Sequence, residues 1–140
     1  MGTAGQTVEI EASPVAVVAT STKTIPHVCL VRNPILSTVS ALNNEATPSI
    51  AFAYLAGYLN SHGYPTTIVD GIGEALNETW MVPEFPGFHC QGLTLNEIVA
   101  RIPAESSIIA FSCMFSGEWP IARNLIEMVR IAFPKALLIA

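Results

Sequence analysis

SIIAFSCMFSGEWPIARNLIEMVRIAFPKALLIA, residues 107–140, combines a strand, a helix and the start of another strand. Ser107–Ser112 is a continuous apolar run, which is typical of a parallel strand buried on both faces. Glu118–Phe133 repeats its apolar residues at helical spacing, with Pro120 in the first turn. The apolar run Ala136–Ala140 then begins the next strand. This order predicts a right-handed crossover between parallel strands.

Two further strands precede this unit. His27–Arg32 and Pro65–Asp70 are short apolar runs, and turn-forming residues follow each of them. Residues 33–46, after the first run, are interpreted as a polar loop that is longer than most such connections. The four strands and intervening helices predict an α/β, Rossmann-like parallel sheet with helices on both faces. The expected strand order is the flavodoxin-like order 2-1-3-4.

The first helix is expected between these two strands. Thr47 and Pro48 suit its N-cap and first helical position, and His62-Gly63 suits its end. Nearly every face of the segment between them is apolar or small. We therefore expect this helix to be buried on most sides.

The chain between the second and third strands divides into two parts. Residues 72–92 contain several prolines and glycines and are expected to be irregular, with a helical turn or two over Glu74–Met81. Thr94 and Glu97 then have the spacing of a capping box. This box predicts the start of a helix that follows directly.

The composition limits the class of protein. The chain has 140 residues, of which 51% are hydrophobic and 12% charged, and its net charge is −5. The six Lys and Arg residues are scattered, without the basic stripe that nucleic-acid binding needs. No run approaches the roughly 20 apolar residues of a membrane span, and no signal peptide is apparent. We therefore expect a cytoplasmic protein that binds neither nucleic acid nor a membrane.

One domain is expected after a short tail. Residues 1–24 are rich in Thr, Ala and Ser and are expected to form a poorly ordered N-terminal tail. Residues 25–140 suit a single domain in length. A doubly wound sheet normally continues past its fourth strand. We therefore expect this domain to be truncated there, as the N-terminal piece of a longer protein.

Several reactive residues have a simpler structural interpretation. Cys113 has no local His partner, so a small buried thiol is favoured over a nucleophile. The adjacent His89 and Cys90 lack the spaced partners of a metal site. Gly71-Ile72-Gly73 lacks the third glycine of a dinucleotide motif and follows the second strand rather than the first. Asp70 either accepts a hydrogen bond from a ligand or caps the next turn, and the sequence leaves both open.

Residues that suit a ligand follow the third strand. Ligands of parallel sheets bind beyond the carboxyl ends of the strands, at the switch point of the strand order. Ser112, Met114 and Phe115 would place a hydroxyl, a thioether and a ring there, and Trp119 follows where the next helix begins. These groups either bind a large, flat, mostly apolar ligand or merely close the core.

Several short segments of this chain, taken together, look like those of one known family. They are Asn33-Pro34, Thr47-Pro48, AYLAGYL at residues 53–59, His62-Gly63-Tyr64, Ile68-Val69-Asp70, Ser112-Cys113-Met114-Phe115 and Trp119-Pro120. Through them, residues 26–140 resemble the cobalamin-binding N-terminal domain of cobalamin-dependent radical SAM enzymes.

The resemblance implies cobalamin held over the strand ends, in an enzyme that serves methyl transfer or related radical chemistry. It also implies a radical SAM barrel beyond residue 140, with an iron–sulfur cluster and SAM. The CxxxCxxC motif of that barrel is absent here, so no catalytic residue is expected in these residues. The expected cobalamin contacts are Asn33, Pro34, Leu36, Asp70, Ser112, Met114, Phe115, Ser116 and Trp119. Because the loop after the first strand holds no His, we expect cobalt without a His ligand.

Two other functions stay open. A flavodoxin-like regulatory or protein-interaction module without a cofactor fits the same strand order. A receiver domain is disfavoured, since Asn33-Pro34 stands where its acidic cluster would lie. A nucleotide-binding enzyme is weakened by the missing glycines and basic groups.

Overall fold

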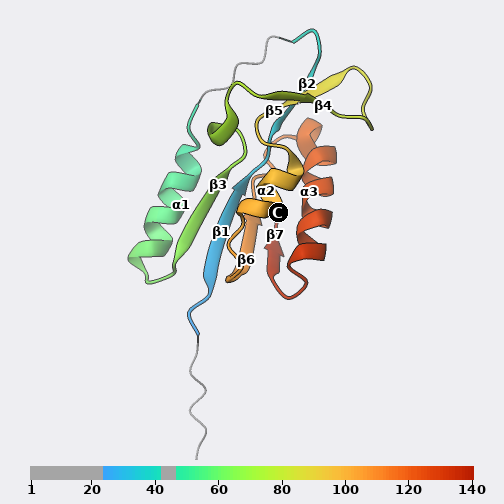
Figure 1. The fold of residues 1–140 in the computed structure, drawn as a ribbon. Helices are drawn as coiled ribbons and strands as arrows, with labels where there is room; N and C mark the ends of the chain where they lie inside the picture. Colours follow the sequence, from blue (N-terminus) through green and yellow to red (C-terminus); the bar gives the residue numbers. More distant parts are fainter. Residues whose placement is uncertain (1–23, 42–46) are drawn as a thin grey trace, which may run out of the picture.

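The computed structural model describes residues 24–41 and 47–140. Its centre is a four-stranded parallel sheet (Figure 1). The strands are β1 (His27–Arg32), β3 (Thr66–Asp70), β6 (Ser106–Phe111) and β7 (Leu137–Ile139), in the order β3-β1-β6-β7. Counted along the chain, these parallel strands have the order 2-1-3-4. The predicted α/β, Rossmann-like fold and its flavodoxin-like order are confirmed.

The two faces of the sheet carry separate hydrophobic cores. Val28 and Leu30 point to one face, where Phe52 of helix α1 (Ile50–Ser61) packs. Cys29 and Val31 point to the other face, toward helices α2 (Leu95–Arg101) and α3 (Trp119–Ala132). This alternation follows from the pleat of a strand, and it explains why consecutive residues in the middle of the central strands, 28–31 and 108–111, are apolar.

Helix α1 differs from its prediction at its start. Its N-cap is Ser49, whose Oγ accepts from the Phe52 backbone N–H at 3.4 Å. Thr47 was expected to be the cap, but its carbonyl oxygen instead accepts a hydrogen bond from Arg32 at 2.9 Å. The end is as predicted, with His62 as C-cap and Gly63 at a φ of +80°.

The outer side of α1 is exposed, so the prediction of burial on most sides is wrong. Phe52 is the buried residue of this helix. Ile50, Tyr54 and Tyr58 are 63%, 77% and 65% exposed. Within the described residues, α1 lies alone on its face of the sheet, so only the side toward β1 and β3 is covered (Figure 1).

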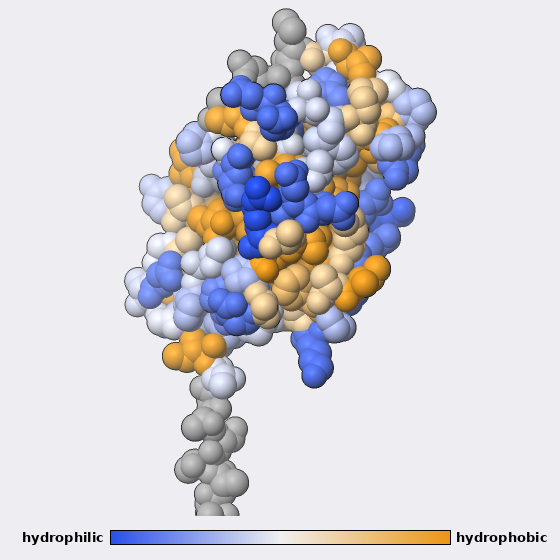
Figure 2. Space-filling model, viewed as in Figure 1, coloured by the Kyte–Doolittle hydropathy of each residue, from blue (hydrophilic) through white to orange (hydrophobic). Residues whose placement is uncertain are grey.

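Helix α2 begins as the sequence predicts. The Thr94 side chain accepts from the Glu97 N–H, and the Glu97 carboxylate accepts from the Thr94 N–H at 2.9 Å, which completes the capping box. The surface over α2 is hydrophilic (Figure 2). The Arg101 Nε, in the last turn of this helix, pairs with Glu74 Oε2 at 2.9 Å. None of the described helices is long and apolar enough to cross a membrane.

A second, antiparallel sheet was not predicted. It consists of β2 (Ile35–Thr38), β5 (Phe88–Gln91) and β4 (Thr79–Met81), in the order β2-β5-β4. Part of the expected loop 33–46 is therefore a strand, while residues 42–46 lie outside the described residues. The helical turn expected over Glu74–Met81 is limited to the short 3-10 helix η1 (Gly73–Ala75). Pairing between distant segments overrides the local turn signals here.

Two glycines allow the second sheet to approach the first. Gly92 has a φ of +114°, and a Cβ on it would collide with the Gly71 carbonyl oxygen. The next residue, Leu93, donates its N–H to that same oxygen at 2.7 Å. A Cβ on Gly71 would in turn meet the Arg32 carbonyl oxygen. Gly71 after β3 and Gly92 after β5 thus allow close backbone packing.

The domain boundary stays a prediction. The expected tail, residues 1–24, lies outside the described residues except for Thr24. The strands and helices of the two sheets lie between His27 and Ile139, within the expected domain of residues 25–140.

Candidate functional site

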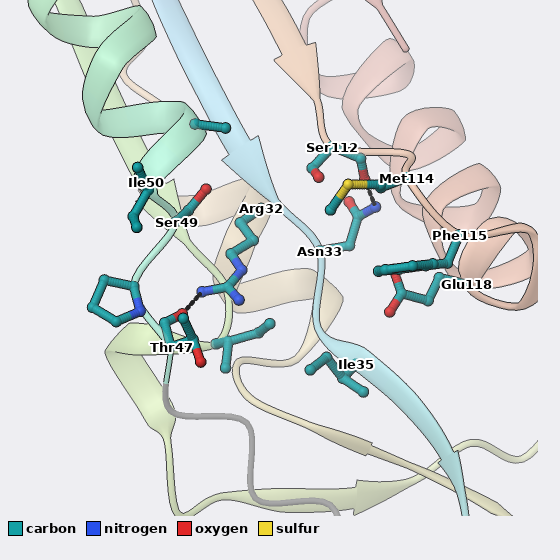
Figure 3. A pocket seen from close by; sticks show the side chains of 13 residues that line it. Arg32, Asn33, Ile35, Thr47, Ser49, Ile50, Ser112, Met114, Phe115 and Glu118 are labelled. Carbon is teal, nitrogen blue, oxygen red and sulfur yellow. Dashed lines mark hydrogen bonds between the residues drawn. The ribbon is translucent and has the colours of Figure 1, made fainter.

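A cleft opens beyond the carboxyl ends of β1 and β6 (Figure 3). Its volume is about 420 Å³. Its walls come from the end of β1, the start of α1 and the loop after β6. In the order β3-β1-β6-β7, β3 is added on one side of β1, and β6 and β7 are added on the other side. The strand order therefore reverses between β1 and β6, and the cleft lies at this switch point, where such sheets bind ligands.

Arg32 joins β1 to the start of α1. Its Nη1 donates to the Thr47 carbonyl oxygen at 2.9 Å and lies 3.5 Å from Asp70 Oδ1. The guanidinium is therefore partly neutralised and held in place within the cleft wall. It supplies a positive potential on the α1 side of the site.

Asn33 is a buried polar residue at the base of the cleft, only 3% exposed. Its Nδ2 donates to the Ser112 carbonyl oxygen at 2.6 Å. Its Oδ1 is buried and has no hydrogen-bond partner among the described residues. A buried acceptor left unpaired costs roughly 1–3 kcal/mol, so this oxygen has an unmet need for a donor.

The loop after β6 forms an exposed apolar wall. Met114 and Phe115 are 75% and 61% exposed, so their apolar surfaces are accessible to a ligand. Glu118 lines the same wall, and burial raises the pKa of its carboxyl while the charge of Arg32 partly offsets that rise. The wall therefore combines apolar contact area with one acidic group.

Asp70 acts as a cap. Its Oδ1 accepts from the backbone N–H groups of Ile72 and Gly73 at 3.1 and 2.9 Å. The sequence left open whether this carboxylate binds a ligand or caps the turn after β3. The structure shows the cap, and Asp70 does not line the cleft.

The structure brings four of the nine expected cobalamin contacts into the cleft: Asn33, Ser112, Met114 and Phe115. The other five lie outside its lining. Pro34 is fully buried, and Leu36 packs toward Cys90 and Ile121. Ser116 lies in the 3-10 helix η2 (Ser116–Glu118), and Trp119, 47% exposed, begins α3.

The nine expected contacts did not include the charged and helix-start residues of the cleft, although the strand-end segments 33–48 and 112–119, where a ligand was expected, contain Thr47, Pro48 and Glu118. Arg32, Glu118 and the segment 47–51 line it. A charged side chain that ends an apolar strand, such as Arg32, was a signal that could have been used. The approach of segment 47–51 depends on where α1 packs, which no local pattern specifies.

The histidines lie away from the cleft. His27 is at the amino end of β1, within 3.1 Å of Thr67 Oγ1. His62 ends α1, and its ring stacks near Tyr58. His89 belongs to β5 and borders a different hollow. Among the described residues, no group of three or more His, Cys, Asp or Glu could hold a metal ion.

The cysteines are poorly ionised. Burial raises the pKa of Cys29 and of Cys90 to about 12, and Glu118 adds to the rise at Cys90. Burial also raises the pKa of Cys113, although the Asn33 side chain partly lowers it. A thiol needs its thiolate form to act as a nucleophile, so these side chains are suited to packing.

No known family model, curated protein or solved structure matches this chain. What the cleft binds is therefore inferred from its own residues and from the resemblance described above.

Proposed function

We propose that this chain is the cobalamin-binding module of a radical SAM enzyme that serves methyl transfer or related radical chemistry. The observation that carries the proposal is the cleft at the switch point, bordered by the exposed Met114 and Phe115. The family resemblance of residues 26–140 supports it. Cobalamin, when bound, would supply the cobalt centre that relays a methyl group from SAM.

The cleft residues fit the edge of a corrin rather than the whole ring. Clefts of roughly 300–1,000 Å³ hold drug-sized ligands, and a corrin is larger than these. A cleft of about 420 Å³ would take one edge of the ring. Met114 and Phe115 would then cover part of its flat apolar face, while Asn33 and Ser112 would hold polar groups on its rim.

The remaining parts of the proposed enzyme lie outside this chain. The iron–sulfur cluster, SAM and the barrel that holds them are expected beyond residue 140. The role proposed for these residues is to bind and orient the cofactor. The runner-up, a protein-interaction module without a cofactor, is favoured by the exposed Ile50, Tyr54 and Tyr58 on α1.

Equilibrium dialysis of the 140-residue chain against hydroxocobalamin tests the proposal. We expect saturable retention, together with a shift of the visible spectrum of the cofactor. Folded protein that retains no hydroxocobalamin, as checked by circular dichroism, would contradict the proposal and favour the interaction module. Flavin mononucleotide serves as the control ligand, since the residues that line the cleft form no glycine loop for a phosphate and the Arg32 guanidinium among them is already engaged by Thr47 and Asp70.

A further inference from the structure

We propose that Asn33 and Glu118 form a subsite for a neutral N–H donor, a peripheral carboxamide of the bound corrin. This assignment rests on the proposed function and specifies how the cleft selects its ligand. Both residues line the same cleft, one at its base and one on the wall formed by the loop after β6 (Figure 3).

The first step concerns the orientation of the Asn33 carboxamide. Its Nδ2 donates to the Ser112 carbonyl oxygen at 2.6 Å. Flipping the amide would place its own oxygen against that carbonyl oxygen, so the observed orientation is fixed. The remaining atom, Oδ1, is an acceptor without a partner among the described residues. A ligand can satisfy this atom only with a donor.

The second step concerns the charge of the donor. Glu118 lines one wall of the cleft, and Arg32 lines another. The acidic wall disfavours an anionic ligand group next to Asn33, while the guanidinium disfavours a cationic one. A neutral group that donates through N–H suits both. The carboxamides on the rim of a corrin are groups of this kind.

The third step concerns access. Asn33 is 3% exposed, so a ligand reaches Oδ1 only after side chains of the cleft wall move. Met114 and Phe115 in that wall are largely exposed. Exposed side chains change rotamer within roughly nanoseconds and without movement of the backbone. The subsite is therefore reachable within the observed fold.

Two corrins that differ only in their rim groups test the assignment. Cobinamide carries carboxamides, and cobyrinic acid heptamethyl ester carries methyl esters, which accept hydrogen bonds but donate none. With both in the aquacyano form, we expect wild-type protein to bind the ester at least about tenfold more weakly. Equal affinity for the two corrins would overturn the assignment while leaving the proposed function intact. Retention of neither corrin would overturn both.

Variants then show which residues cause the preference for the corrin with carboxamides. In Asn33→Ala the two affinities should converge to within about threefold, because the unmet acceptor is gone. Glu118→Ala should narrow the ratio in the same direction, because the Glu118 carboxylate can accept from the N–H groups of a carboxamide but not from an ester, and it provides the test if Asn33→Ala does not fold. Glu127→Ala is the matched control on an exposed part of α3 and should keep the wild-type ratio. A tenfold preference that persists in Glu118→Ala and in folded Asn33→Ala would refute the subsite.

Discussion

Asn33 and Ser112, 79 residues apart, are joined by a 2.6 Å hydrogen bond from the Asn33 Nδ2 to the Ser112 carbonyl oxygen. The bond connects the carboxyl ends of the two central strands, β1 and β6. It also holds the Asn33 carboxamide in one orientation, with Oδ1 unpaired at the base of the cleft. One side chain thus links the sheet topology to the chemistry of the site.

The apolar wall of the cleft should be required for cofactor binding. Phe115→Glu would place a charge against the corrin face, and we expect at least about tenfold weaker binding of hydroxocobalamin. Ile131→Glu is the matched control, because Ile131 is 83% exposed in the last turn of α3. Equal weakening in both variants, measured by equilibrium dialysis, would show that the loop after β6 has no special role.

The proposed cobalt environment lacks a protein His. His89 lies in β5 and borders a hollow separate from the cleft. We therefore expect the cofactor to bind with its own base displaced and with no His on cobalt. The electron paramagnetic resonance spectrum of the cobalt(II) form should show no nitrogen splitting and should be unchanged in His89→Ala. Nitrogen splitting that disappears in His89→Ala would show that this residue is a ligand.

Gly92 should be intolerant of a side chain. Gly92→Ala adds a Cβ that collides with the Gly71 carbonyl oxygen, at a φ of +114° that residues with a Cβ rarely adopt. We expect a loss of more than about 2 kcal/mol in the free energy of unfolding by urea. Gly87→Ala is the control, since Gly87 has a φ of +87° but open space around it. Its cost should be about 1 kcal/mol, and equal losses would argue against the close approach of the two sheets.

Two carboxyl groups should affect the pH dependence of stability in opposite directions. Hydrogen bonds from Thr94 lower the pKa of Glu97 below its ordinary value of 4.5. The Glu97 carboxylate therefore stabilises the fold above pH 4.5, and this stabilisation is lost as the pH falls through the lowered pKa. Burial raises the pKa of Glu118, so ionisation of Glu118 opposes folding as the pH rises from 4.5 through the raised pKa.

Urea unfolding at a series of pH values checks both signs. Glu97→Gln should lose less stability than wild type on acidification below pH 4.5. Glu118→Gln should lose less stability than wild type as the pH rises above 4.5. Parallel pH profiles for wild type and both variants would contradict these two pKa directions.

Much of the parallel layer could be predicted because its signals are local. The apolar run Ser106–Phe111 is long enough to indicate a strand buried on both faces. The capping box of Thr94 and Glu97 marks the start of α2 within one residue. Such signals depend only on the sequence of the segment, so they can be recognised without knowledge of the rest of the fold.

The second sheet could not be predicted, because its strands are short and pair across long separations. Ser37 lies opposite His89, 52 residues later in the chain. Strands of three or four residues show no reliable alternation, and the prolines between β4 and β5 suggest a loop. Only the pairing itself defines these strands.

The residues of the site were only partly predictable from the sequence. The switch-point rule places Ser112, Met114 and Phe115 at the correct edge of the sheet. It does not specify which side chains point away from the cleft: Pro34 is fully buried, and Leu36 packs against the cluster of Val82, Cys90 and Ile121. These orientations are set by the second sheet, which the sequence does not reveal.

Amide chemical shifts measured during a hydroxocobalamin titration test the central claim most directly, because they report both binding and its location. Binding in the cleft should give saturable shifts at Asn33 and at the loop Ser112–Phe115. The amides of Tyr54 and Tyr58 on the outer side of α1 should not shift and serve as the internal control. Shifts confined to the outer side of α1, or none at saturating cofactor, would contradict cobalamin binding in the cleft between β1 and β6.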